Sequence, residues 1–384
     1  MPVDVRTVES PESAEIYITA TPPSGIPVHR QAEAIFPEIK HVLEMTGARL
    51  LEERIFATDK AFGAIEPIRA GAYGNLADGI PPSRLAVPKG IVGEIAGIQI
   101  HAVRSSQPPK PLRLGESACG RVLYSSGGEY ISLSGLSAPD VGPDPTAQAR
   151  AVFERAETAL KQVGADMRSV ARTWVWLDDI VSWYPEFNRV RTRFFIERGL
   201  MDRRSEAHRP PASTGIGVSL SGGPRIGLDL VAIPAERDSM RHYSAAGSQG
   251  SPYEYGSAFS RATIAMTPAG KTVFVSGTAA IDARGATQHV GDPEAQINDT
   301  IEHARAVLRD MNCADQDVVQ AIAYSKAIAV ERLVRATWKQ IPWPCLSVLA
   351  DICREELLFE IEVTACPGAR DLPVSEAAPT EERV

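Results

Sequence analysis

The sequence predicts an α+β fold in which one structural unit occurs three times in a single chain. Two observations predict it: three helix-like segments of one design recur along the 384 residues, and strand-like stretches flank each of them in the same order. A unit of this kind has one amphipathic sheet with helices on a single face, so its other face needs cover. Further copies of the unit are the simplest cover, and we therefore expect a closed pseudo-trimer with clefts between neighbouring units.

The repeated helices carry the clearest signal. They are expected within residues 29–48, 144–166 and 292–315, where apolar side chains recur at helical spacing. The first two segments align at a constant offset that places Gln148 in the position of Gln31, and the third segment places Gln296 there. Three helices of one design imply three domains.

Strand-like stretches flank each helix. The stretches before the helices cover residues 15–21, 130–136 and 273–279, and those after them cover residues 50–59, 169–179 and 317–326. A less regular helical stretch follows, then a segment led by Pro82, Pro211 or Pro344, and then a closing strand over residues 97–103, 227–233 or 359–365. The order predicted for each unit is β, long α, β, short α, β, β.

These elements divide the chain into three units and a tail. The units are expected to cover residues 1–117, 118–245 and 246–366, and the first of them is the most degenerate. Residues 367–384 are polar, acidic and contain prolines, so we expect a disordered tail there.

Composition excludes several classes of function. The net charge is -8 and no basic block occurs, which argues against a nucleic-acid-binding face. No apolar run approaches the length of a membrane span, and the first residues lack a basic segment followed by an apolar one. Five cysteines without CxxC spacing indicate a reducing compartment, and the seven histidines show no metal-ligand spacing. We therefore expect a cytoplasmic protein without a metal or cofactor.

The segment at residues 350–363, ADICREELLFEIEV, is the candidate for chemistry. Strand side chains alternate between faces, so Glu360 and Glu362 point to one face while the apolar residues that alternate with them, Phe359, Ile361 and Val363, point to the other. Two acids on a solvated sheet face are the ordinary explanation of such a pattern.

Several motifs resemble the Rid (YjgF) family. They are the SGL and SGT signals, the aromatic strand and helix over residues 174–188, the Pro-Ala-Ser-Thr segment and the terminal EIExxA. This resemblance implies chorismate-mutase-like α+β units of the kind that form Rid homotrimers, with ligand sites in the clefts between units.

The chain departs from the deaminases of that family. Their motif has an arginine two residues after the proline, which is present as Arg84 but replaced by Ser213 and Leu346 in the other units. A serine or a leucine cannot form the bidentate contact of a guanidinium with a carboxylate. The motif's first glutamate survives as Glu360, whereas Gln99 and Gly227 are assigned to that position in the first two units. No unit has both groups, so the usual deaminase arrangement is not expected.

Where the chain differs from the deaminases, it resembles the chorismatases. These are single-chain hydrolases with a Rid-like C-terminal part. The segments that carry this resemblance are residues 210–217, 252–262, 273–281 and 350–362. It implies hydrolysis of chorismate, a dicarboxylate enol ether, with release of pyruvate. Cleaving the ether needs a proton on the methylene carbon, which a carboxylic acid in a dry cleft can supply. Glu360 is the candidate acid.

The remaining candidate residues surround that acid. Cys353 stands seven residues before Glu360, where the resemblance implies a 3-hydroxybenzoate product in place of a dihydrodiol; the alternative is a small buried hydrophobic residue. Arg261 and Arg354 are expected to bind the substrate carboxylates, although Arg354 could instead form a surface salt bridge. Further candidates for substrate binding are Tyr255 and Tyr324 through hydroxyls and Thr214 and Gly215 through backbone N–H groups in a tight segment, with packing or an ordinary turn as the alternatives.

Three functions remain open. The first is a monomeric chorismatase-like hydrolase acting on a small carboxylate in one cleft. The second is a divergent deaminase that uses the cleft near Arg84, and the third is a binding module without catalysis. A binding module needs the arginines but no proton donor, so Glu360 together with Cys353 and Arg261 favours the first.

Overall fold

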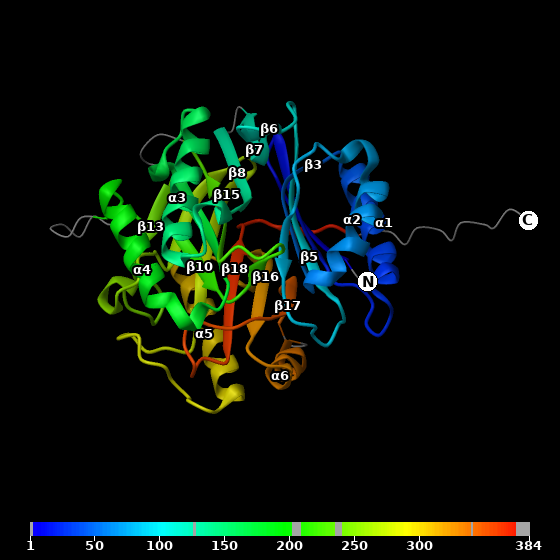
Figure 1. The fold of residues 1–384 in the computed structure, drawn as a ribbon. Coiled ribbons are helices and arrows are strands. Elements are labelled where there is room, and N and C mark those ends of the chain that lie inside the picture. The colour runs from blue at the N-terminus through cyan, green and yellow to red at the C-terminus, as the bar shows by residue number, and fades with distance from the viewer. Residues whose placement is uncertain (1–2, 126–127, 202–208, 235–239, 339–340, 374–384) are drawn as a thin grey trace, which may run out of the picture.

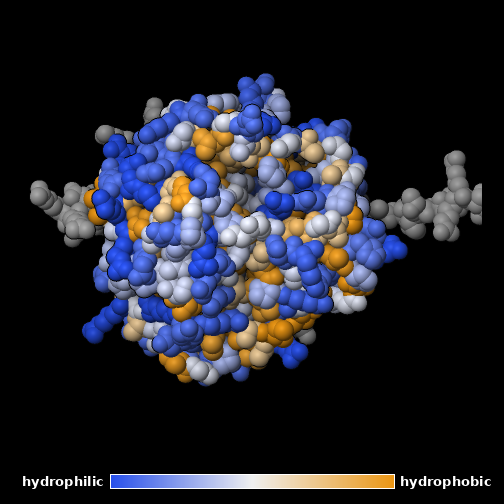
Figure 2. All heavy atoms as spheres, in the orientation of Figure 1, coloured by the Kyte–Doolittle hydropathy of each residue, from blue (hydrophilic) through white to orange (hydrophobic). Residues whose placement is uncertain are grey.

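The computed structural model describes residues 3–125, 128–201, 209–234, 240–338 and 341–373. It contains three β-sheets that lie together in the centre, with the helices on the outside (Figure 1). The prediction of three tandem α+β units in one chain is confirmed. Hydrophilic residues cover most of the face seen in Figure 2, and apolar residues appear there in scattered patches.

Each unit begins with a β-hairpin and continues with alternating helices and strands. The first unit contains β1 (Val3–Glu9), β2 (Ser13–Ala20), α1 (Val28–Thr46), β3 (Arg49–Ala57), α2 (Phe62–Tyr73), β4 (Ser83–Ala86) and β5 (Ile95–Ser105). The central unit contains β7 (Ser117–Ser125), β8 (Gly128–Leu136), α3 (Pro145–Gln162), β9 (Val170–Leu177), α4 (Ile180–Glu197), β10 (Ala212–Ile216) and β12 (Ile226–Ala232). The third unit contains β14 (Ala262–Thr267), β15 (Gly270–Ala279), α5 (Pro293–Asp310), β16 (Val318–Ser325), α6 (Ile328–Trp338), β17 (Cys345–Leu349) and β18 (Phe359–Ala365).

The three sheets share one topology. The closing strand lies between the second hairpin strand and the strand that follows the long helix, in the orders β2-β5-β3-β4, β8-β12-β9-β10 and β15-β18-β16-β17. The last two strands of each order run parallel, because a helix connects them. The short strands β6 (Lys110–Leu114), β11 (Ser219–Leu220), β13 (Met240–Tyr243) and β19 (Arg370–Asp371) extend the sheets at their edges.

Some details differ from the predicted units. The first strand of each hairpin was not predicted, and α4 is as long as α3, at 18 residues, so the central unit has no short second helix. Strand β6 pairs with β7 and strand β13 with β14, which moves two short segments across the expected boundaries after residues 117 and 245. The tail is not disordered throughout, because β19 pairs with β1; residues 374–384 lie outside the described residues.

The aligned glutamines make the same contacts in all three units. Each side chain is buried near the start of its long helix and donates a hydrogen bond to a backbone carbonyl of a neighbouring loop. Each side-chain oxygen accepts a hydrogen bond from the backbone N–H at the start of the closing strand, at Ile95, Arg225 or Leu358. These bonds fix the position of each closing strand relative to its helix and satisfy buried backbone groups.

The inner faces of the sheets form a common core. One hydrophobic cluster takes residues from all three sheets, including Phe56, Trp176, Tyr324 and Leu346. A separate cluster lies beneath the helices of each unit. The sheets therefore cover one another as predicted, and the clefts between units are where polar side chains from two units can meet. None of the helices within the described ranges is long and apolar enough to cross a membrane.

Candidate active site

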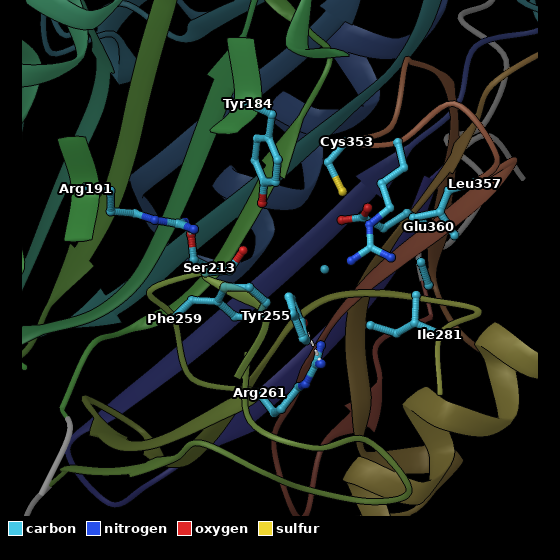
Figure 3. A pocket seen from close by; sticks show the side chains of 15 residues that line it. Tyr184, Arg191, Ser213, Tyr255, Phe259, Arg261, Ile281, Cys353, Leu357 and Glu360 are labelled. Atoms are coloured by element: carbon cyan, nitrogen blue, oxygen red, sulfur yellow. Dashed lines mark hydrogen bonds between the residues drawn. The ribbon is translucent and has the colours of Figure 1, made fainter. Parts of the chain in front are cut away.

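A small cavity lies between the central and third units. Helix α4 and strand β10 supply its wall from the central unit, and β15, β18 and the loops at residues 251–261 and 353–357 supply the rest (Figure 3). The lining residues are Tyr184, Arg191, Ser213, Gly215, Tyr255, Ser257, Phe259, Arg261, Gly277, Ala279, Ile281, Cys353, Arg354, Leu357 and Glu360. Most of the predicted site residues therefore meet in one place.

Glu360 on β18 lies at the wall of this cavity and is only 6% exposed. Burial raises the pKa of its carboxyl to about 8, with a further rise from the negative charge of Glu362; Arg172 and Arg261 act in the opposite direction. The backbone of β15 passes close to the carboxyl at Gly277, where an added Cβ atom would stand 2.0 Å from Oε1 of Glu360. Glu360 is thus a carboxylic acid that keeps its proton at neutral pH.

Cys353 lines the same cavity. Its thiol and the Glu360 carboxyl point toward the same part of the site (Figure 3). Burial raises the pKa of the Cys353 thiol to about 12, and the neighbouring Glu360 adds to the rise. The cysteine is therefore a neutral thiol and not a thiolate nucleophile at neutral pH.

Arg261, directly before β14, is buried beside Tyr255. Its guanidinium donates a hydrogen bond of 2.6 Å to the Tyr255 hydroxyl and one of 3.1 Å to the carbonyl of Gly250. Burial lowers the pKa of Arg261, as expected for a cation in a dry site that lacks a paired carboxylate. The Tyr255 hydroxyl thus orients Arg261, a contact that differs from both roles expected for this residue, a hydrogen bond to the ligand or packing.

Arg354 approaches Tyr255 from another side. Its guanidinium carbon lies 5.7 Å from the centre of the Tyr255 ring, and its Nη1 donates hydrogen bonds to the carbonyl of Gly285 and to Thr287. Among the described residues no carboxylate lies within salt-bridge distance of Arg354, so the alternative of a surface ion pair is not observed there.

Arg191 on α4 is the third cation that lines the cavity, and the sequence did not lead us to predict it. It is 1% exposed, donates a hydrogen bond of 2.6 Å to Asn188 and a longer one to Ser213, and its Nε has no partner within the described part of the chain. The position is helical, and the buried aromatic residues at Phe187, Phe194 and Phe195 share its face of α4. An arginine on the apolar face of an amphipathic helix is the signal that could have revealed it.

Three guanidinium groups, those of the buried Arg191 and Arg261 and of the half-buried Arg354, therefore face this cavity without an acidic partner in the described ranges. Ion pairing normally accompanies the burial of an arginine, because an isolated buried charge is costly. Glu360, which carries the only carboxyl group among the described lining residues, is largely uncharged at neutral pH. The site is consequently complementary to a small anion with more than one negative charge.

Two of the predicted binding residues do not reach the cavity. Tyr324 is fully buried in the core shared by the sheets, because its side chain lies at the centre of the pseudo-trimer. The Thr214 hydroxyl accepts a hydrogen bond of 2.6 Å from Arg172 and faces away from the cavity lining. Gly215 does line the cavity, but it belongs to β10, so the tight turn expected at residues 214–215 is a parallel strand.

The contacts of the aligned glutamines also correct one alignment between units. Two residues beyond the backbone N–H that each glutamine binds stand Gly97, Gly227 and Glu360. The equivalent of Glu360 in the first unit is therefore Gly97 and not Gln99, because Gly97 holds the same position in its closing strand. Gln99 instead corresponds to Asp229 and Glu362.

The other two clefts are filled at this position. A Cβ atom at Gly97 would lie 2.4 Å from a methyl group of Leu346 in the third unit, and one at Gly227 would lie 2.4 Å from a methyl group of Leu220. Leu346 occupies the place where Rid deaminases carry their arginine. Arg84, the arginine retained in the first unit, is exposed and forms an ion pair with Glu66. In the described part of these two clefts, a glycine without a carboxyl group therefore stands at the position of Glu360.

Comparisons with known proteins agree with this architecture. The family model of endoribonuclease L-PSP matches residues 118–233 and 256–366, which is more than half of the chain. A crystal structure of a chorismatase shares 19% sequence identity and a TM-score of 0.60 over 94% of this chain and 99% of that chain. The search of curated proteins finds no match.

Two further solved structures are similar to a third of this chain. A Mycobacterium tuberculosis member of the YjgF/YER057c/UK114 family shares 24% identity over 33% of this chain and 98% of its own, with a TM-score of 0.25. The yeast protein YEO7 shares 14% identity over 33% of this chain and 98% of its own, with a TM-score of 0.28. The predicted kinship with the Rid superfamily is confirmed by the family match, and the chorismatase likeness extends along almost the whole chain. The chain belongs to the endoribonuclease L-PSP family and has the fold of a chorismatase.

Proposed function

We propose that this protein is a chorismatase-like hydrolase that cleaves the enolpyruvyl ether of chorismate and releases pyruvate. The observation that carries the proposal is Glu360, a buried carboxylic acid whose pKa is raised to about 8 inside a cavity with three arginines. The fold shared with a chorismatase supports it. We further propose that the protein acts as a monomer in the cytoplasm.

The charge of the cavity fits the substrate. Chorismate carries two carboxylates, and Arg191, Arg261 and Arg354 offer guanidinium groups without acidic partners in the described structure. Arg191 approaches from α4 of the central unit, whereas Arg261 and Arg354 belong to the third unit. The two carboxylates can therefore be held from opposite walls, which orients the ether between them toward Glu360.

Glu360 supplies the proton in this mechanism. Its carboxyl protonates the methylene carbon of the enol ether, and the ether oxygen stabilises the resulting cation as an oxocarbenium ion. Water adds to that cation and loses a proton, for which the Glu360 carboxylate is the acceptor. The resulting hemiketal collapses to pyruvate and the ring alcohol, so the acid is regenerated at the end of the cycle.

Cys353 is proposed to direct the product. The released ring is a dihydrodiol if the reaction stops at hydrolysis, and it is 3-hydroxybenzoate if the ring also loses water and becomes aromatic. The resemblance to the chorismatases implies the aromatic product when a cysteine stands at this position. The neutral thiol of Cys353 lies beside the acid, where it can contact the ring.

The experiment is an assay of pyruvate release from chorismate by the purified protein. We expect wild-type turnover and a loss of at least about 10³-fold in Glu360→Gln, because the amide cannot transfer a proton. Arg84→Met, at an exposed position outside the cavity, serves as the matched control and should retain full activity. No pyruvate from the wild-type protein, or full activity in Glu360→Gln, overturns the proposal.

The same assay separates the alternatives. A deaminase working near Arg84 would release no pyruvate from chorismate. The exposed ion pair of Arg84 with Glu66 and the leucine-filled cleft also argue against this alternative. A binding module would bind chorismate without releasing pyruvate. Its arginines would suffice for that role, and the protonated Glu360 would have no use.

A further inference from the structure

Glu362, the second acid on β18, is fixed in a buried ion pair. It is 5% exposed; its Oε2 accepts a hydrogen bond of 3.0 Å from Arg172, and its Oε1 accepts one of 2.6 Å from the indole N–H of Trp174. Arg172 also donates a hydrogen bond to the Thr214 hydroxyl. The two partners of Glu362, Arg172 and Trp174, both lie on β9 of the central unit. A carboxylate that accepts hydrogen bonds from two donors in a buried site is held in one orientation.

This fixed charge lies next to the candidate acid. Glu360 and Glu362 are two residues apart on one strand, so their Cα atoms are separated by about 6.6 Å and their side chains share a face. Because both side chains are buried, one ionised carboxylate at that distance disfavours ionisation of the second.

Other groups surround Glu360 from each neighbouring element. They are Arg172 on β9, Tyr184 and Arg191 on α4, Tyr255 and Arg261 before β14, Tyr324 on β16, and Cys353 and Arg354 in the loop before β18. The four tyrosine and cysteine hydroxyl or thiol groups are neutral, and the arginines favour loss of the proton from Glu360. Among the described groups around Glu360, the negative charge of Glu362 acts in the other direction.

We propose that Glu362 is a positioning residue for the proposed reaction, because its fixed negative charge keeps the proton on Glu360 and so keeps the acid ready at neutral pH. The inference rests on the proposed function. Glu362 acts in two ways: it repels a negative charge on Glu360, and it neutralises Arg172, which would otherwise attract that charge. Removing the Glu362 charge changes both effects in the same direction.

The test compares the pH dependence of kcat/KM for the wild type, Glu362→Gln and Glu362→Asp. In Glu362→Gln the midpoint of the alkaline loss of activity should move down by at least one pH unit, while the activity at pH 5.5 stays within about threefold of the wild type. Glu362→Asp keeps the charge and should keep a midpoint near that of the wild type. A loss of activity that is uniform across pH indicates a merely structural role and overturns the inference.

A second measurement needs no substrate. The carboxylic C=O infrared band that distinguishes wild type from Glu360→Gln reports protonation of Glu360 directly, and it should titrate at lower pH when Glu362 is replaced by Gln. An unchanged titration overturns the role of Glu362, whereas a shifted titration in a protein that releases no pyruvate supports the charge coupling and overturns the proposed function alone.

A double variant covers the case in which Glu362→Gln does not fold. Arg172→Met combined with Glu362→Gln removes both members of the buried ion pair, a change that proteins often tolerate better than the loss of one member. Because Glu362 has the larger effect on Glu360, the infrared midpoint of the double variant should still lie below that of the wild type. A midpoint at or above the wild-type value contradicts the proposal.

Discussion

Glu360 and Glu362 share one face of β18, yet Glu362 is bound to Arg172 and to Trp174 whereas the carboxyl of Glu360 has no cation within salt-bridge distance among the described residues. The difference arises from the neighbouring strands. Beside Glu362 the central unit presents the side chains of β9, and beside Glu360 the backbone of β15 leaves room at Gly277 and the cavity opens. The second acid is therefore held in an ion pair, and the first is the one whose carboxyl faces the cavity.

The raised pKa of Glu360 predicts that replacing this residue by one that does not titrate increases the free energy of unfolding near neutral pH. The pKa is about 8 in the folded protein and near 4.5 when the chain is unfolded, so its contribution to folding is fully present below pH 4.5 and is lost as the pH rises through 8. Glu360→Gln does not titrate. At pH 7 we expect its free energy of unfolding to exceed that of the wild type by roughly 3 kcal/mol, with no difference at pH 4.

Urea unfolding of both proteins at several pH values measures this difference. Glu66→Gln, at an exposed position, is the control and should follow the wild type throughout. Equal stability of Glu360→Gln and wild type at both pH 4 and pH 8 would show that Glu360 ionises normally in the folded state.

Arg191 is predicted to bind substrate and to contribute little to folding. Its side chain makes hydrogen bonds to Asn188 and Ser213 but no ion pair within the described structure, so Arg191→Met removes a buried charge without leaving an acid unpaired. We expect kcat/KM for chorismate to fall about 100-fold, as for the loss of one charge-assisted hydrogen bond, with an unchanged or higher thermal unfolding midpoint. Kinetics and a thermal scan together check it; a large drop in the unfolding midpoint would instead assign Arg191 to the core.

Much of the fold could be predicted from the sequence because three copies of one pattern reinforce each other. The glutamine at the start of each long helix gave the offset between units, and the structure shows why it recurs: each one ties its helix to the closing strand. Glu360, Cys353, Arg261 and Arg354 also meet in one cavity as predicted, since they lie in segments whose order in the unit could be assigned.

The rest depends on contacts that no single segment contains. Gln99 was placed two positions away from its true equivalent, because strand alternation looks the same after a shift of two residues. Arg191 enters the site from another unit, and which unit faces Glu360 follows only from how the sheets close on one another. Tyr324 points to the same face of its sheet as Glu360, with which it pairs, but it lies in the common core and not in the cavity lining.

Two glycines in the cavity wall allow a matched test of how closely Glu360 is held. A methyl group at Gly277 would stand 2.0 Å from Oε1 of Glu360, whereas the nearest atom to one at Gly215 would be 3.5 Å away on Tyr184. We expect Gly277→Ala to displace the carboxyl and to lower kcat by more than about 100-fold, because a misplaced acid transfers its proton poorly. Gly215→Ala should keep kcat within a few-fold. The opposite order of the two effects in the pyruvate assay would contradict the placement of the acid.

Cys353→Ala tests the proposed control of the product. The pKa of the Cys353 thiol is about 12, so the thiol is neutral near pH 7 and does not attack the substrate as a thiolate. Its removal should therefore leave the rate of the first step, ether cleavage, within about tenfold of the wild-type rate. If Cys353 directs the loss of water from the ring, the variant should release pyruvate together with the dihydrodiol in place of 3-hydroxybenzoate. Chromatography of the ring product measures this ratio, and Cys345→Ala, at a cysteine outside the cavity, is the control. An unchanged product ratio with normal pyruvate release would leave Cys353 as a wall of the cavity and place the choice of product in other residues.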